Sequence, residues 1–295
     1  MPIALPSPQV LEIIGSDAIA FAHAQFASDV RALAVGQWQW SAWLSAQGRV
    51  RAFFRIVRID EERLLLILQG GLAETLRAAL APFVFRAKVQ IRVPASRHAI
   101  GFERLAEVLA CLGAVPGATD VVIAGGRIGM AIPGPEPRWY VLAESQPDAA
   151  GDDSPAALNR WSAADIAAGI VEVNAAQADR FLPTWLGLEP LGAISVRKGC
   201  YPGQEVVARL HFKGGNKRWL HRLAFSVEVL PRPGTPLASV DGAAAGELLG
   251  AAWTEPGQGL ALAVLPKLPA QTRLAVPGVL GASFRVLSTI GGPTD

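Results

Sequence analysis

Cysteine is scarce in this chain, with two among its 295 residues, Cys111 and Cys200. Two cysteines cannot build the disulfide framework of a small secreted protein, so a reducing cytoplasm is the expected compartment. No group of His, Cys and carboxylate residues has the spacing of a metal site. A single thiol cannot hold an iron–sulfur cluster alone. We therefore expect no resident metal, and expect any contact with a cluster to be transient and shared with a partner.

Long apolar runs and a strong net charge are lacking as well. No uninterrupted run reaches the ~18 residues of a membrane span, and the first residues lack the basic segment of a secretory signal. No membrane partner is therefore expected. The net charge of +2 predicts no strong general affinity for nucleic acid, so such binding would need a local patch. Neither a phosphate-binding Walker loop nor a dinucleotide fingerprint is present.

The chain does have enough apolar sequence for more than one core, since 51% of its residues are hydrophobic. Helical and strand-like segments are mixed along it, which favours an α+β fold over a doubly wound parallel sheet. We predict three units. They are an α+β subdomain over residues 1–95, a second α+β subdomain over 96–216, and a β-barrel domain over 217–295.

Apolar periodicity and turn residues place the elements of these units. In the first unit we predict helices over 18–33 and 72–82, and strands over 37–44, 49–59, 62–69 and 84–93. In the second we predict a helix around Cys111, strands over 120–125 and 138–143, a surface loop over 146–155 and a helix over 156–169. In the third we predict short strands over 223–230, 236–240, 246–253, 259–265, 272–276 and 282–287, which is the pattern of a small antiparallel barrel.

The most distinctive stretch is residues 196–209, Val-Arg-Lys-Gly-Cys-Tyr-Pro-Gly-Gln-Glu-Val-Val-Ala-Arg. Lys198 lies close to Cys200, and a helix starting after the cysteine would place the thiol at its positive end; both effects favour a thiolate. Gln204 and Glu205 can bind the polar edge of a flat heterocycle. The alternative is structural: a small buried thiol, a tight turn and an ordinary helical pair of Glu205 with Arg209.

Residues 191–209 resemble the signature of the YgfZ family, whose pattern is Lys-Gly-Cys-aromatic-x-Gly-Gln-Glu. These are folate-binding relatives of the glycine-cleavage aminomethyltransferase (T-protein), linked to iron–sulfur cluster maintenance and tRNA modification. Further segments agree with the same family. They are residues 15–30, 40–50, 165–170, 181–183 and 214–218.

The resemblance implies a fold and a function. The fold would be α+β, with T-protein-like folate-binding domains arranged as a ring around a central folate site and a six-stranded antiparallel barrel at the C-terminal end. The protein would be a tetrahydrofolate-binding accessory protein for assembly or repair of iron–sulfur enzymes, including tRNA-modifying ones. Its cofactor would be tetrahydrofolate or a one-carbon derivative. Its partners would be iron–sulfur enzymes or assembly factors, together with a contact to tRNA.

The same resemblance suggests the site residues. Cys200 is the key thiol and Lys198 its catalytic neighbour. The residues expected at folate are Trp40, Tyr201, Gln204, Glu205 and Arg209. Tryptophans 38, 40, 43 and 185 are available as pocket walls, although core packing explains such aromatics equally well. The basic turn at Lys217 and Arg218 follows the signature and suits a folate tail or RNA phosphates, although such a run is usually a solvated face.

One departure from the T-protein pattern concerns the carboxylate that holds the pterin ring. We align Ala167 with that glutamate, and Glu172 is the candidate to replace it. The mismatch argues against a standard aminomethyltransferase. A folate-dependent one-carbon enzyme, aminomethyltransferase-like, stays open as the alternative to an accessory protein.

Overall fold

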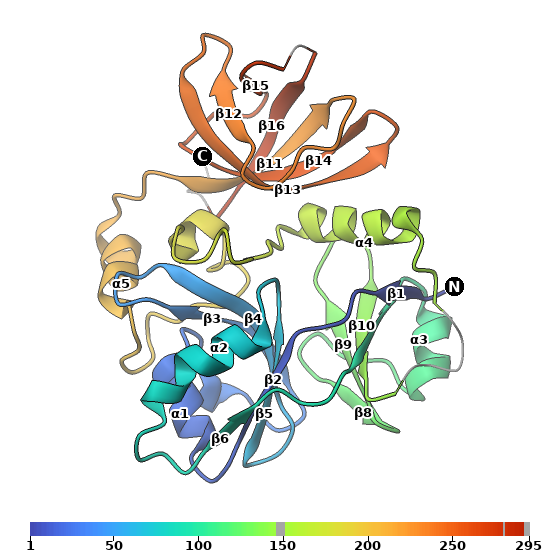
Figure 1. Ribbon diagram of the computed structural model, residues 1–295, viewed down its shortest axis with the longest axis vertical. Coiled ribbons are helices and arrows are strands. Elements are labelled where there is room, and N and C mark those ends of the chain that lie inside the picture. The colour runs from blue at the N-terminus through green and yellow to red at the C-terminus, as the bar shows by residue number, and fades with distance from the viewer. Residues whose placement is uncertain (146–150, 280, 292–295) are drawn as a thin grey trace.

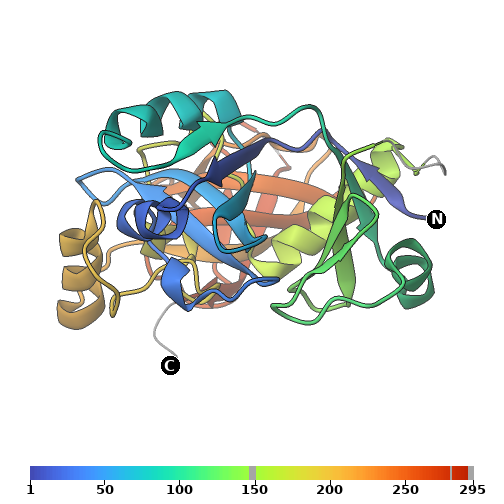
Figure 2. The same ribbon diagram turned by 90° about the horizontal axis from the view of Figure 1, so that it is seen from below.

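The computed structural model describes residues 1–145, 151–279 and 281–291, and it contains two open sheets and a closed barrel (Figure 1). Part of the loop predicted over residues 146–155 lies outside the described residues. The two open sheets lie side by side, and the barrel lies across them. Seen from below, α5 (Gln204–Lys213) and α3 (Leu105–Leu112) mark opposite edges of the molecule (Figure 2).

The first sheet is antiparallel and has the strand order β3-β4-β5-β2-β6. Its strands are β2 (Val10–Ile14), β3 (Trp38–Leu44), β4 (Val50–Arg58), β5 (Arg63–Leu68) and β6 (Gln90–Arg92). Because side chains alternate across a strand, β4 sends Phe54 to one face and Phe53 to the other. Helices α1 (Ala18–Gln25) and α2 (Ala73–Leu80) cover the Phe54 face, so the Phe53 face is left for the centre of the molecule.

The second sheet has the order β1-β7-β10-β9-β8. Its strands are β1 (Ile3–Leu5), β7 (His98–Phe102), β8 (Val122–Ala124), β9 (Arg127–Ile132) and β10 (Arg138–Ala143). Helix α3 packs on one face through Val108 and Leu112. The other face, with Tyr140 and Leu142, joins the same core cluster as Phe53 of the first sheet. The two inner faces therefore share one core.

The barrel closes in the order β11-β14-β13-β12-β15-β16. Its strands are β11 (Trp219–Ser226), β12 (Pro236–Ser239), β13 (Ala244–Glu255), β14 (Gln258–Leu265), β15 (Arg273–Ala275) and β16 (Ser283–Ile290). All six predicted strands are present, which confirms the expected antiparallel barrel. Closure leaves no open sheet edge, so this unit needs no covering helix of its own.

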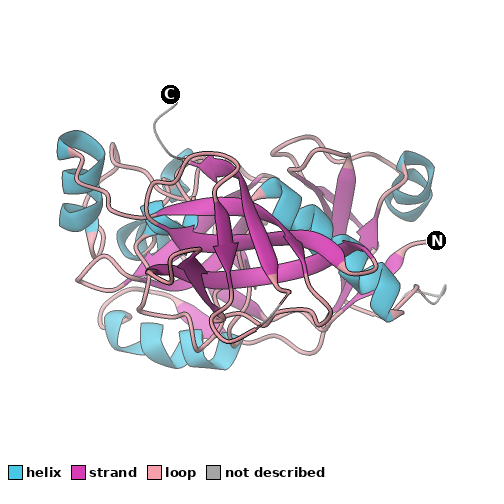
Figure 3. Ribbon diagram, turned by 90° about the horizontal axis from the view of Figure 1, so that it is seen from above, coloured by secondary structure: helices cyan, strands magenta, loops and turns pink. Residues whose placement is uncertain are grey.

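Helix α4 (Pro155–Ala168) packs between the second sheet and the barrel, and it passes beneath the barrel strands (Figure 3). Asn159 binds the backbone of Trp253 in β13 twice, with its side-chain amide donating to the carbonyl and its side-chain oxygen accepting from the amide, each at 2.8 Å. On the sheet side, Trp161 packs so closely over Gly101 that a Cβ there would lie 2.6 Å from the indole. This contact holds the helix against the sheet.

The first unit differs from its predicted elements in three respects. Two strands that were not predicted, β1 and β2, precede the first helix, and β1 pairs with β7 of the second sheet. The predicted strand over 84–93 is reduced to β6, because residues 85–87 form a turn after the short helix η2 (Ala81–Phe83). The predicted helix over 18–33 ends at Gln25, and η1 (Val30–Ala32) follows it.

The early end of α1 has a physical cause in a distant segment. The ammonium of Lys198 donates to the backbone oxygens of His23 and Phe26, the second at 2.5 Å. Carbonyls at the last turn of a helix lack intrahelical donors, and a cation there is favoured by the helix dipole. The signature loop thus terminates α1 from 172 residues away in sequence.

Candidate functional site

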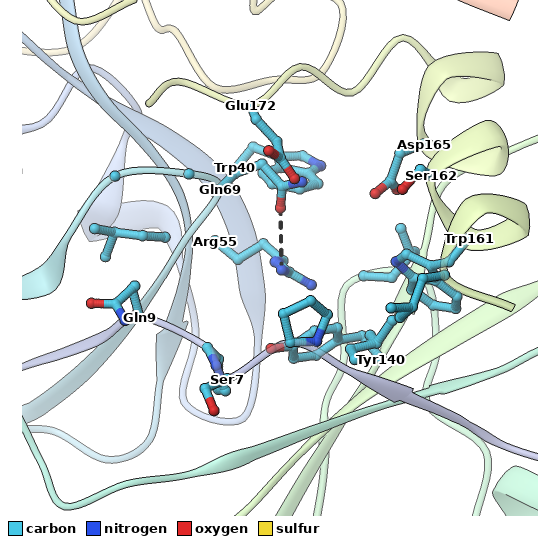
Figure 4. Close-up of a pocket in the computed structure, with 18 residues that line it drawn as sticks. Ser7, Gln9, Trp40, Arg55, Gln69, Tyr140, Trp161, Ser162, Asp165 and Glu172 are labelled. Atoms are coloured by element: carbon cyan, nitrogen blue, oxygen red, sulfur yellow. Dashed lines mark hydrogen bonds between the residues drawn. The ribbon is translucent and has the colours of Figure 1, made fainter. Parts of the chain in front are cut away.

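A cavity of about 270 Å³ opens between the two sheets beneath α4 (Figure 4). The first sheet contributes Trp40 of β3 and Arg55 of β4, the second contributes Tyr140 of β10, and α4 contributes Trp161 and Asp165. The remaining walls come from residues 5–9, 68–71, Ile132, Leu158, Ser162 and Glu172. Aromatic walls with a few charged groups are the usual composition of a small-molecule site.

Arg55 is the central cation of this cavity. It is 6% exposed and lies opposite Trp40 in the β3–β4 register. Its guanidinium carbon is 4.0 Å from the Tyr140 ring centre, and one terminal nitrogen donates to Gln69 Oε1 at 3.3 Å. Among the described residues no carboxylate forms an ion pair with it, and its Nε has no acceptor. Burial lowers the pKa of this guanidinium from its ordinary value.

Two carboxylates line the same cavity. Burial raises the pKa of Asp165, although the Arg138 guanidinium lies 2.6 Å away and acts in the opposite direction. Burial also raises the pKa of Glu172, and the negative charge of Asp165 adds to that effect. Asp165 is half-buried and Glu172 is exposed to the cavity and solvent, so both carboxyl groups can accept hydrogen bonds from a ligand or hold a proton beside it.

The chain around these groups keeps them in place. Arg138 fixes α4 to the second sheet through Asp165, through the Trp161 carbonyl at 3.3 Å, and by stacking over the Trp161 ring at 4.9 Å. At the end of β5, Gly70 has a φ of +85°, and a Cβ there would lie 2.9 Å from the Val173 backbone. Only glycine allows this close approach, which places Gln69 and Glu172 on one wall.

The signature loop lies elsewhere, beside the C-terminal end of α1 and the β3–β4 turn. Its glycine Gly203 has a φ of +79° and precedes α5, and a Cβ there would lie 2.6 Å from Gly48 Cα. Cys200 is exposed on this loop. Lys198 is 7% exposed, and its ammonium lies 4.9 Å from the Tyr201 ring centre in addition to the two carbonyls of α1.

Burial sets the titration of two signature residues. It lowers the pKa of Lys198 to about 8, against a smaller opposing effect of Asp29. It raises the pKa of Tyr201 to about 12, and the charge of Glu189 adds to that rise. The Tyr201 hydroxyl is buried without a hydrogen-bond partner among the described residues. Both groups therefore belong to the interior of the loop, beneath the exposed thiol.

Only some of the site residues predicted from the sequence line the central cavity. Trp40 lines the cavity, whereas none of Tyr201, Gln204, Glu205 and Arg209 does, so their binding of folate stays a prediction. Lys198 and Cys200 are also outside it. Glu172, the candidate replacement for the pterin carboxylate, is on the cavity wall, while Ala167 is absent from it. Of the basic turn, Arg218 lines a different cleft, between residues 180–185 and the barrel.

Sequence reasoning missed Arg55, Tyr140, Trp161 and Asp165. For one of them, Arg55, the sequence contains a feature that could have predicted a functional role. Strand β4 has three arginines, and Arg55 is the one inside its apolar stretch, residues 52–57, where a buried charge is unfavourable without a partner. Tyr140 and Trp161 resemble ordinary core residues in sequence. Asp165 is one acid in a helix, without a pattern that marks it as buried.

Comparison with known proteins agrees with this architecture. No protein-family model matches the sequence. The chain is 30% identical over 236 residues to the tRNA-modifying protein YgfZ of Shigella sonnei, which covers 76% of this chain and 72% of the relative. The match to YgfZ of Edwardsiella ictaluri is 29% over 233 residues, covering 75% and 70%.

The fold itself is that of the T-protein. The structure aligns with the crystal structure of the glycine cleavage system aminomethyltransferase T from Bartonella henselae with a TM-score of 0.70. The alignment covers 99% of this chain and 86% of the other, at 16% sequence identity. At that identity the likeness establishes the fold alone. The sequence relatives establish more, and the chain belongs to the YgfZ family of tRNA-modifying proteins.

Proposed function

We propose that this protein is a tetrahydrofolate-binding accessory protein of the cytoplasm that supports the assembly or repair of iron–sulfur enzymes, including enzymes that modify tRNA. The observation that carries the folate part is the cavity, where Arg55 is buried without an ion-pair partner among the described residues. The charge of Asp165 attracts this guanidinium without forming an ion pair, and a cation buried without a direct partner is unfavourable in the free protein. A ligand that accepts its hydrogen bonds would remove that cost.

The residues of the cavity fit the pterin ring of tetrahydrofolate. A pterin is flat and has a polar edge with both N–H donors and an oxygen acceptor. Trp40, Tyr140 and Trp161 provide aromatic walls, Arg55 provides donors, and Glu172 provides an acceptor. Two buried donor atoms in the wall, Arg55 Nε and Trp40 Nε1, lack acceptors within the described part of the chain. Polar atoms left in this state favour a bound partner over an empty apolar space.

The proposed accessory role also uses the exposed thiol. Cys200 lies on the surface of the signature loop, where a second protein can reach it. Since one thiol cannot hold a cluster, its contact with an iron–sulfur enzyme would be shared and transient. We assign Lys198 to positioning this loop, because its ammonium is occupied by two carbonyls and the Tyr201 ring. If folate also contacts the signature loop, part of the ligand must extend out of the cavity. The residues it would reach there are Tyr201, Gln204, Glu205 and Arg209.

A folate-dependent one-carbon enzyme remains the second candidate, and one observation favours it. Asp165 and Glu172 line the cavity wall with raised pKa values, as general acids and bases often do. Turnover of a methylene or aminomethyl donor in the presence of tetrahydrofolate would support this candidate. Stoichiometric binding without turnover would favour the accessory role.

The test combines calorimetry with rescue of a deletion strain. Wild type should bind tetrahydrofolate, and Arg55→Met should weaken binding at least tenfold, since a charged hydrogen-bond donor is worth about 1.5–3 kcal/mol. Arg51→Met is the matched control, because Arg51 is also on β4 but does not line the cavity. Cys200→Ser should bind tetrahydrofolate like wild type yet fail to restore tRNA modification. Absence of binding by wild type would refute the folate role, and full rescue by Cys200→Ser would refute the thiol role.

A further inference from the structure

A second cleft, of about 350 Å³, lies between residues 180–185 and the barrel. One wall comes from residues that lead into the short helix η3 (Pro183–Leu186), and the other comes from strands β12, β13 and β14 and the end of the basic turn. The residues that line it are Arg180, Phe181, Trp185, Arg218, Gly234, Pro236, Gly246, Glu247 and Val264. It shares no residue with the central cavity.

Positive charge exceeds negative charge around this cleft. Arg218 donates to the Ala245 carbonyl at 3.2 Å, and it has no carboxylate partner within the described ranges. Arg180 pairs with Glu247 at 2.6 Å, but the Arg180 side chain is 48% exposed, so this pair is weak and can be exchanged for another anion. Arg49 lies above Trp185 and donates to the Arg180 carbonyl. The cleft wall thus holds two guanidinium groups, of Arg180 and Arg218, and one carboxylate, of Glu247, with the Arg49 guanidinium over the Trp185 ring beside it.

The cleft also has an aromatic wall with an unused donor. Trp185 is half-buried, and the Arg49 guanidinium carbon lies 5.1 Å from its ring centre. Its indole Nε1 is buried without an acceptor in the parts of the chain that the structure describes. The sequence made Trp185 available as a wall of the folate pocket, but Trp185 does not line the central cavity. Its neighbours are cations and the barrel.

We propose that this cleft binds a single-stranded segment of RNA, with a base against Trp185 and backbone phosphates on Arg218 and Arg180. Single-stranded nucleic acid is bound by cationic grooves that combine phosphate contacts with aromatic stacking, and both parts are present here. The proposal rests on the proposed function in tRNA modification and gives the tRNA a place on the protein. Lys217, exposed beside Arg218, extends the positive surface along the basic turn.

The experiment measures binding of a fluorescently labelled unmodified tRNA, and of a short single-stranded RNA, over a series of salt concentrations. Wild type should bind both, with affinity falling as salt rises because cations are released from the phosphates. Arg218→Ala should lower the slope of log affinity against log salt by about 0.7, the value for one single-strand phosphate. Trp185→Leu should weaken binding roughly tenfold without changing that slope, and Trp185→Phe should keep most of the affinity.

Arg273→Ala is the matched control, since it removes an exposed barrel cation that does not line the cleft. Equal weakening by Arg273→Ala and Arg218→Ala would overturn the proposal, as would full RNA binding by Trp185→Leu. Displacement of RNA by an acidic peptide, with no effect of the Trp185 variants, would identify a general anion surface instead. Tetrahydrofolate calorimetry on the same samples separates the outcomes: folate binding without RNA binding refutes this inference alone.

Discussion

The central cavity and the signature loop each bury one cation, and the two cations differ in the hydrogen-bond acceptors around them. Lys198 has two carbonyl acceptors and an aromatic ring beneath it. Arg55 has one amide oxygen at 3.3 Å, and its Nε has no acceptor among the described residues. Burial opposes the charged form of both groups. Both cations also lie over aromatic rings, Arg55 over Tyr140 and Trp40. The difference lies in the hydrogen bonds: two backbone carbonyls accept from the Lys198 ammonium, whereas Arg55 Nε lacks an acceptor within the described chain.

The number of hydrogen-bond acceptors around each buried cation distinguishes a structural role from a proposed ligand-binding role. Membership in a recognisable motif does not make that distinction. The lysine of the most recognisable motif closes the end of α1, whereas the arginine with no motif around it faces an aromatic cavity. Buried polar groups are normally satisfied, so the unpaired Arg55 Nε in a cavity wall supports the proposed ligand. The following predictions test this contrast, from the largest expected effect to the smallest.

The largest effect on stability is expected at Lys198. Lys198→Met leaves the carbonyls of His23 and Phe26 without their donor, and should lower the free energy of unfolding by about 1–3 kcal/mol. Arg55→Met should cost little or stabilise, because it removes a poorly compensated buried charge. Urea unfolding of the two variants measures both values. A larger loss for Arg55→Met than for Lys198→Met would break the comparison.

The contribution of Lys198 should depend on pH. Its pKa is about 8 in the folded protein and 10.5 as the ordinary value, so the unfolded chain binds more protons between these values. Stability from this group therefore rises with pH from about 8 to 10.5. Melting temperatures of wild type and Lys198→Met should diverge over this window. Parallel curves would show that the ammonium is not desolvated as the structure implies.

Glu172→Gln should weaken tetrahydrofolate binding and raise the melting temperature at pH 7 only slightly, by about 1 °C or less, because the side chain is exposed and its charge is screened by solvent. The folded pKa of Glu172 is raised by burial, so ionisation above the ordinary value of 4.5 costs stability that glutamine does not lose. The difference between the two proteins should shrink as the pH falls toward 4.5. Glu255→Gln, exposed at the end of β13 and outside the cavity, is the control and should change neither property. A drop in melting temperature for Glu172→Gln would argue for a structural carboxylate.

The smallest effect is expected at Tyr201. Its hydroxyl is buried without a partner in the described structure, so Tyr201→Phe should change the free energy of unfolding by less than about 0.5 kcal/mol, or stabilise slightly. Tetrahydrofolate affinity should not change through this hydroxyl, because Tyr201 is outside the cavity. Chemical unfolding and calorimetry check the two statements. A clear loss of affinity would bring the signature loop back into the folate site.

Much of the fold follows from local pattern, and the barrel is the clearest case. Its strands alternate regularly and its turns contain glycine and proline, so each segment carries its own signal. The errors fall where distant parts of the chain intervene. Helix α1 is shorter than its apolar pattern because Lys198 caps it, and β1 leaves its neighbours in sequence to pair with β7.

The sequence alone determined the family signature, the antiparallel barrel and the presence of an unusual cysteine loop, because each is encoded in adjacent residues. Only the tertiary structure decided which residues share a cavity. Arg55, Tyr140 and Glu172 lie on separate segments that meet when two sheets turn their inner faces to each other. The burial of Arg55, with its Nε lacking an acceptor among the described residues, arises where these two faces meet. No local pattern specifies it, because burial depends on what the rest of the chain places nearby.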